Sequence, residues 1–324
     1  MYEHTVRAIT ADPWAITPDK LAALCEFINA KLSGADIRYE AAVAPEQRRT
    51  RDIAVLPLFG VLAHRANMVT NASGGTSLQK FSRDLSALAN DPNIGAIIID
   101  IDSPGGSVTG LEETAAQIAE AVKRKTVIAH ANAMAASGAY WLGSQSSELW
   151  ITPSGQVGSI GVLAMHQDVS QAFESKGVKT TFITAGRYKA EGAPEQPLTE
   201  EARDYMQERV DQYYDSFVKA VARGRHVSEK EVRNGFGQGR AVGAQQALRS
   251  GMVDGIGTLE NVVDRIARGQ ITGNGKRARL QAPAVAAKDD DARLFWARQQ
   301  YESANGDDAV ENARFFWTRE QYER

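Results

Sequence analysis

The stretch Asn132-Ala-Met-Ala-Ala-Ser-Gly-Ala-Tyr140 sets a serine, Ser137, among small residues with Gly138 directly after it. The apolar run 127–129 before it is typical of a buried strand, and 139–142 after it has the size and apolarity of a buried helix. A serine at such a strand-to-helix turn can present its hydroxyl beside the free N–H groups of a helix start. An ordinary helix start without chemistry is the other interpretation of these nine residues.

A second turn lies about thirty residues earlier in the chain. The isoleucine-rich run 95–102 predicts a buried strand, and Ser103-Pro-Gly-Gly-Ser107 follows it directly. Two glycines after a proline, Gly105 and Gly106, give a sharp turn whose bare backbone N–H groups a carbonyl oxygen can approach closely. Such donors are what an oxyanion hole needs, although a plain strand-to-helix turn has the same composition.

Two further segments complete a set of four motifs. Val157-Gly-Ser-Ile-Gly-Val162 contains Ser159, and Thr184-Ala-Gly-Arg-Tyr-Lys-Ala-Glu-Gly192 has Lys189 at its centre. In this order and spacing, the motifs resemble the S49 family of serine peptidases, which includes the signal peptide peptidase A proteins and phage relatives. The resemblance covers about residues 50 to 268.

The resemblance implies both a fold and a catalytic mechanism. The implied fold is an α/β fold of the ClpP/crotonase-like kind, built from repeated β-β-α units. Ser137 would be the nucleophile, Lys189 the base of a Ser-Lys dyad, and Ser159 a hydroxyl that orients the lysine. Backbone N–H groups of the Gly105-Gly106 turn and of Gly138 would hold the oxyanion.

The residue after the lysine departs from the pattern of the family. An acidic residue is frequent there, whereas this chain has Ala190 followed by Glu191. A lysine base has to be neutral, and burial in an apolar pocket favours the neutral amine. The departure leaves the local orientation of Lys189 open but not the dyad itself.

Sequence patterns divide the chain into three parts. Residues 1–52 are predicted to be an N-terminal helical leader and a linker at 33–52, 53–268 a single catalytic domain, and 269–324 a flexible tail. Strands that alternate with helices favour an α/β fold with parallel pairing. Strands are predicted at 53–62, 95–102, 125–131, 148–152, 160–165 and 178–184. Helices are predicted at 78–88, 111–122, from Ser137, at 198–223 and from 240 to Gly251.

The tail contains an internal repeat. Residues 292–302 return as 313–323, and both copies have the pattern Phe-Trp-x-Arg-x-Gln-Tyr. Two short aromatic motifs on a flexible segment favour docking peptides that are used twice. The alternative is an amphipathic tail that packs on its own domain.

Composition narrows the possible partners. The formal net charge of the 324 residues is -3, so no global basic field favours nucleic acid. The single cysteine, Cys25, excludes an intramolecular disulfide and suits a reducing compartment. No CxxC or HExxH pattern suggests a metal site, no cofactor is implied, and no apolar run approaches the length of a membrane span. A secretory signal is also lacking, so the expected location is the cytoplasm of a bacterial host, possibly inside a phage procapsid.

The resulting hypothesis is a serine endopeptidase that works through an acyl-enzyme as a homo-oligomer. The phage relatives suggest head maturation, with phage head proteins as substrates and partners; degradation of cytoplasmic peptides is the alternative. Rival hypotheses are an inactive assembly protein, a crotonase-like binder of acyl thioesters, and a Ser-His-Asp triad. The triad would have to use one of five histidines, which are His4, His64, His130, His166 and His226.

Overall fold

The computed structural model describes residues 13–32, 47–50, 52–65 and 75–271. The tail with its two aromatic repeats, and most of the predicted linker at 33–52, lie outside the described residues. The predicted leader helix is confirmed as α2 (Pro18–Leu32).

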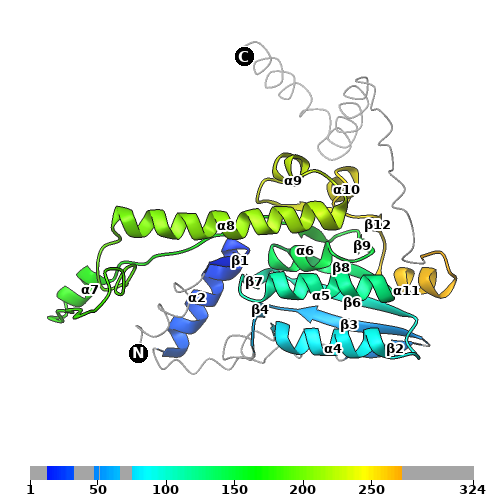
Figure 1. Cartoon of the computed structure of the whole chain (residues 1–324), viewed down its shortest axis with the longest axis horizontal. Helices are drawn as coiled ribbons and strands as arrows, with labels where there is room; N and C mark the ends of the chain where they lie inside the picture. Colours follow the sequence, from blue (N-terminus) through cyan, green and yellow to red (C-terminus); the bar gives the residue numbers. More distant parts are fainter. Residues whose placement is uncertain (1–12, 33–46, 51, 66–74, 272–324) are drawn as a thin grey trace, which may run out of the picture. The chain divides into compact units, whose positions relative to one another are not determined.

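A mostly parallel sheet forms the centre of the fold (Figure 1). The long strand β8 (Thr126–Ala136) has β6 (Ala96–Ser103) on one side and both β9 (Glu148–Ile151) and β10 (Gln156–Gly158) on the other, all parallel to it. The other members of this sheet are β3 (Ile53–Phe59), β12 (Gly255–Ile256), and the antiparallel strands β2 (Arg48–Thr50) and β11 (Ala241–Gly243).

A smaller sheet lies at the carboxyl ends of these strands, with the order β1-β7-β4-β5. Its strands are β1 (Trp14–Ile16), β7 (Gly105–Ser107), β4 (Leu62–Ala63) and β5 (Thr76–Ser77). Strand β3 runs into β4, β5 and helix α4 (Leu78–Asn90), and β6 runs into β7 and helix α5 (Leu111–Arg124). Each unit therefore places a strand in the large sheet, continues in the small sheet and ends in a helix. The predicted α/β fold of repeated β-β-α units is confirmed.

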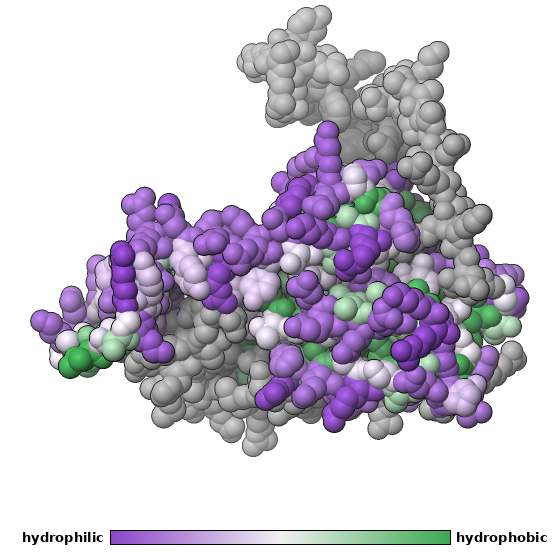
Figure 2. Space-filling view, viewed as in Figure 1, coloured by the Kyte–Doolittle hydropathy of each residue, from purple (hydrophilic) through white to green (hydrophobic). Residues whose placement is uncertain are grey.

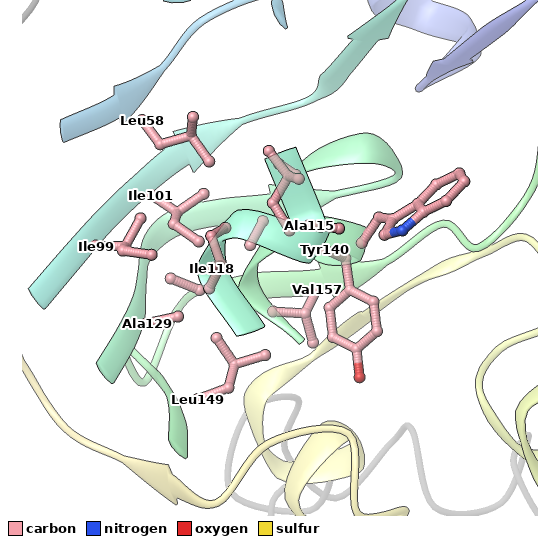
Figure 3. Packing of buried hydrophobic residues seen from close by; sticks show 14 of the residues in the cluster. Leu58, Ile99, Ile101, Ala115, Ile118, Ala129, Tyr140, Leu149 and Val157 are labelled. Carbon is pink, nitrogen blue, oxygen red and sulfur yellow. The ribbon is translucent and has the colours of Figure 1, made fainter. Parts of the chain in front are cut away.

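Alternation along β6 explains how the sheet is covered on both faces. Ile97, Ile99 and Ile101 belong to the main core with α4, α5 and α6 (Gly138–Gly143), and Figure 3 shows two of them packed near Ile118. Ile98 points to the other face, where Val262 of α11 (Leu259–Ala267) covers it. A strand buried on both faces needs a continuous apolar run, which is why this one was predictable.

Helix α8 (Glu200–Arg225) joins the core through its C-terminal half. Phe217 stacks on Trp141 of α6 with ring centroids 4.7 Å apart. The N-terminal half extends away from the sheet toward α7 (Ser170–Glu174) (Figure 1). The remaining helices, α9 (Glu229–Gly235) and α10 (Ala244–Arg249), follow α8 in the chain.

Four sequence predictions differ from the structure. Segments 160–165 and 178–184 are not strands, because neither has a neighbouring strand to satisfy its backbone; 160–165 makes only an isolated bridge at Leu163. The predicted linker contains β2, which pairs with β3. The helix expected from residue 240 begins at Ala244, because 241–243 pair with β10 as β11.

A buried ion pair ties α8 to the end of the large sheet. Arg225 is 5% exposed, and its guanidinium donates two hydrogen bonds to the Asp254 carboxylate, at 2.7 and 2.9 Å. The same carboxylate accepts from the backbone N–H of Leu149 in β9. Loss of one partner leaves a buried charge uncompensated.

We therefore expect Arg225→Met to lower the free energy of unfolding by about 3–5 kcal/mol. The matched control is Arg233→Met, because Arg233 makes a similar 2.7 Å bond to Asp215 at the surface. An exposed pair contributes no more than about 1 kcal/mol. Urea denaturation of both variants checks the difference, and equal losses would contradict this account of Arg225.

Candidate active site

Ser137 occupies the turn between β8 and α6, as predicted from the sequence. Its backbone has φ 53° and ψ −121°, a region that non-glycine residues rarely adopt. Such strain costs on the order of 1–3 kcal/mol and persists only where the surroundings hold it. Here the Ser137 N–H donates to the carbonyl of Gly158 at 2.7 Å, which locks the turn to β10.

The Ser137 hydroxyl is buried, with the residue 1% exposed. Its Oγ has the carbonyl oxygen of Gly161 at 3.4 Å as a long hydrogen-bond acceptor. This contact directs the hydroxyl toward segment 160–165 and the small sheet. A serine held on a sharp strand-to-helix turn is the arrangement of a nucleophile elbow.

The two glycine turns meet directly in front of Ser137. A Cβ on Gly105 would lie 2.9 Å from the backbone nitrogen of Gly138, so the two backbones touch. Gly105 has φ +99° and would clash with the carbonyl oxygen of Ala15 at 2.0 Å, and a Cβ on Gly106 would meet the Leu62 carbonyl oxygen at 1.9 Å. These positions admit only glycine, so the three predicted oxyanion-hole residues are brought together.

Lys189 is placed elsewhere. It lies in an exposed turn closed by a bond from its N–H to the carbonyl of Gly186. Its side chain lines an open pocket of about 810 Å³ with residues such as His166, Tyr205 and Met206, and Ser137 does not line this pocket. No hydrogen bond or ion pair joins Lys189 to Ser137 in the described chain.

Ser159 is close to the serine turn and not to the lysine. It follows Gly158, which accepts the Ser137 N–H bond, and its own N–H donates to the carbonyl of Arg240. Its φ is 52°, so a second serine with positive φ follows β10, the strand that pairs directly with β8. Lys189 would have to approach Ser137 for the predicted orienting role of Ser159 to apply.

Three of the described histidines make contacts away from Ser137, and His4 lies outside the described residues. The Nε2 atom of His130 lies 3.0 Å from the Gly257 carbonyl oxygen, and its Nδ1 atom lies 3.7 Å from a carboxylate oxygen of Asp100. His166 faces the Ala193 carbonyl, and His64 lines a separate pocket beside α4 and α5. No histidine of the described residues contacts Ser137 in a hydrogen bond, so the triad hypothesis has no support from this geometry.

Sequence analysis missed one feature of the site. The carbonyl oxygen of Ala15 lies against Gly105 and Gly138, because β1 pairs with β7 at this point. The signal was the apolar run 14–16 just before the leader helix, which is too short for a periodic pattern.

No group of three or more His, Cys, Asp or Glu side chains is arranged to hold a metal ion within the ranges described. Within those ranges, too, every helix is too short or too polar to cross a membrane.

The chain is similar to several known proteins. The model of peptidase family S49 matches residues 119–271, which include Ser137, Ser159 and Lys189. Capsid assembly protease C of Escherichia phage lambda is 32% identical over 256 residues, 78% of this chain and 56% of that protein. The head-tail preconnector protein of Enterobacteria phage P21 is 34% identical over 175 residues, 54% of this chain and 35% of that protein.

The chain thus spans about half or less of the length of these two curated relatives. Among solved structures, a ClpP1 from Listeria monocytogenes matches 64% of this chain and 92% of its own, with 14% identity and a TM-score of 0.39.

Proposed function

The chain belongs to peptidase family S49, and on that premise we propose that it is a serine endopeptidase with Ser137 as nucleophile and Lys189 as base. The observation that carries the proposal is the strained, buried serine with two glycine turns packed in front of it. In the reaction, Oγ of Ser137 attacks the scissile carbonyl carbon and its proton passes to the neutral lysine. The lysine then protonates the leaving amine, and water hydrolyses the acyl-enzyme.

Backbone N–H groups of Gly138 and of the Gly105-Gly106 turn are the proposed oxyanion donors. Their support is the close approach of the two turns, in which Gly105 lies against the backbone nitrogen of Gly138. Fixed donors in a buried site stabilise the developing oxyanion strongly, because no solvent has to reorganise. The basic test is hydrolysis of an unfolded polypeptide by the purified chain, followed by the appearance of new amino termini. A chain with a folded core that releases none would contradict the proposal.

A homo-oligomer would complete the site, because the lysine segment of one chain does not meet its own serine. Segment 176–199 carries exposed large hydrophobic residues, among them Val178 at 50% and Ile183 at 97%. Figure 2 shows a group of hydrophobic residues at the far left of the molecule, in the area where Figure 1 labels α7. We propose that the segment packs on a second copy and brings Lys189 to the partner copy's serine turn. Burial there would also favour the neutral amine that a base requires.

The proposed setting is the maturation of phage heads in the cytoplasm of a bacterial host or within a procapsid. Its support is the pair of phage relatives, of which one is called a capsid assembly protease and the other a head-tail preconnector protein. The proposed substrates are head proteins of the same phage, cut as extended or unfolded segments. The aromatic repeats at 292–302 and 313–323 are the proposed contact with this assembly.

We expect the tail to be separable from catalysis. A chain that ends at Ile271 keeps the core residues described here. The truncated chain should keep its peptidase rate, and its free energy of unfolding should change by less than about 0.5 kcal/mol. Co-sedimentation with head proteins should be lost, because the truncation removes both aromatic motifs. Two weak motifs on one linker bind an assembly much more tightly than either motif alone. A large drop in melting temperature would instead place the repeats in the core.

A further inference from the structure

Strand β1 crosses the front of the candidate active site as an extended segment bonded on both edges. On one edge the Trp14 N–H donates to the Leu163 carbonyl at 2.8 Å, and the Leu163 N–H returns a bond to Trp14 at 3.0 Å. On the other edge β1 is antiparallel to β7, with Ala15 opposite Gly106. A peptide that adds a strand to a sheet edge makes main-chain bonds of this kind.

The carbonyl oxygen of Ala15 lies against two glycines of the proposed oxyanion hole, Gly105 and Gly138. It lies 2.0 Å from the position of a Cβ on Gly105 and 3.2 Å from that of a Cβ on Gly138. Both glycines belong to the proposed oxyanion hole, and an acyl oxygen has to enter this hole in the transition state. The chain itself therefore presents a peptide carbonyl to the hole.

Side chains along β1 alternate between two environments. Ala15 is fully buried in the main core, together with Leu111 and Ala139 beside the serine turn. Trp14 and Ile16 belong instead to a separate cluster with Leu21 and Leu24 of α2. The position whose carbonyl enters the hole thus holds a methyl group, while both neighbours carry large apolar side chains.

We propose that segment 13–17 is a resident peptide in the substrate groove, and that substrates bind as it does. The groove takes an extended polypeptide as a strand between β7 and Leu163, with a small residue such as alanine at the hole and bulky apolar residues on either side. Because the segment is part of the chain, it competes with substrates at a high effective concentration. This inference rests on the proposed function, since it assigns a substrate class to the same site.

The anchor of the segment can be weakened without touching Ser137 or the glycine turns. Trp14→Ala removes the indole from the α2 cluster, so that less apolar packing holds β1 in the groove. The substitution does not remove any backbone hydrogen-bonding group of β1. Ile266→Ala is the matched control, because Ile266 packs against the cluster on the other face of the large sheet. Leu21→Ala is a second loosening variant on α2, for use if Trp14→Ala fails to fold.

Peptide binding tests the proposal without catalysis. In a Ser137→Ala background, a fluorescein-labelled Pro-Trp-Ala-Ile-Thr peptide is titrated by anisotropy. We expect the loosened variant to bind at least about tenfold more tightly than the background alone, because the open groove becomes more populated. The Ile266→Ala control should bind like the background, and a peptide with tryptophan in place of its alanine should not bind. Equal affinity in the loosened and control variants, each with a folded core, would overturn the proposal.

The two hypotheses fail in different ways. With Ser137 intact, loosening should raise kcat/KM for an alanine-containing peptide by a similar factor. If the loosened variant binds peptide more tightly but no variant cleaves it, the resident-peptide proposal is supported and the peptidase proposal is rejected. If kcat/KM is unchanged in both Trp14→Ala and Leu21→Ala, the peptidase proposal is supported and the resident-peptide proposal is rejected.

Discussion

Replacement of Ser137 by alanine is expected to lower kcat/KM for peptide hydrolysis by at least about a thousandfold, since the nucleophile of the acyl-enzyme is lost. Folding should be retained, because the bonds that hold this turn come from the backbone, including the one to the Gly158 carbonyl. The melting temperature of Ser137→Ala should therefore stay close to that of the wild type. A progress curve with a fluorogenic peptide, together with a thermal melt, measures both quantities.

Ser86→Ala on α4 is the matched control, because it removes a hydroxyl that lines only the separate pocket beside α4 and α5. It should hydrolyse peptides at the wild-type rate. Hydrolysis at the wild-type rate by Ser137→Ala would exclude the assigned nucleophile, whatever the result for the control.

Co-expression of two inactive variants is expected to restore activity. Lys189→Ala should be as inactive as Ser137→Ala, because each dyad needs both side chains. If Lys189 serves the serine of a neighbouring copy, random mixed oligomers contain intact pairs at about a quarter of their sites. About a quarter of the wild-type rate should then return in the unselected mixture, and more in purified heteromers, although no single chain is intact.

The control for this experiment is Lys176→Ala, which removes a nearby exposed lysine and should be active by itself. Mixed oligomers are isolated through different affinity tags on the two variants, so that only heteromers are assayed. If verified heteromers remain inactive while the wild type cleaves, the dyad is formed within one chain and segment 176–199 moves to its own serine.

The parts of the fold that were predictable have local causes. The run 95–102 is apolar on both faces and the helix at 78–88 has regular apolar spacing, so each pattern identifies its element without long-range information. The serine turn was also predictable, because a strand pattern, small residues and a helix pattern follow one another directly. All three are found where they were expected.

The parts that were not predictable depend on distant partners. Strands β1 and β10 have three residues each, and they exist because β7 and β8 supply bonding edges. Segment 178–184 has strand-like composition but no such edge, so it is not a strand in this chain. Lys189 follows this segment in the chain, and it lies in an exposed turn. Sequence spacing therefore singled out Lys189 but contained no information on where Lys189 lies relative to Ser137.

The assignment of Ser137 as the reactive nucleophile is tested most directly by covalent labelling. The purified chain is treated with a biotinylated fluorophosphonate, digested with trypsin and mapped by tandem mass spectrometry. The account predicts one label per active site, on Ser137, which a peptide substrate suppresses by competition. A label on another serine, or peptide cleavage by a chain whose Ser137 stays unlabelled, would contradict it.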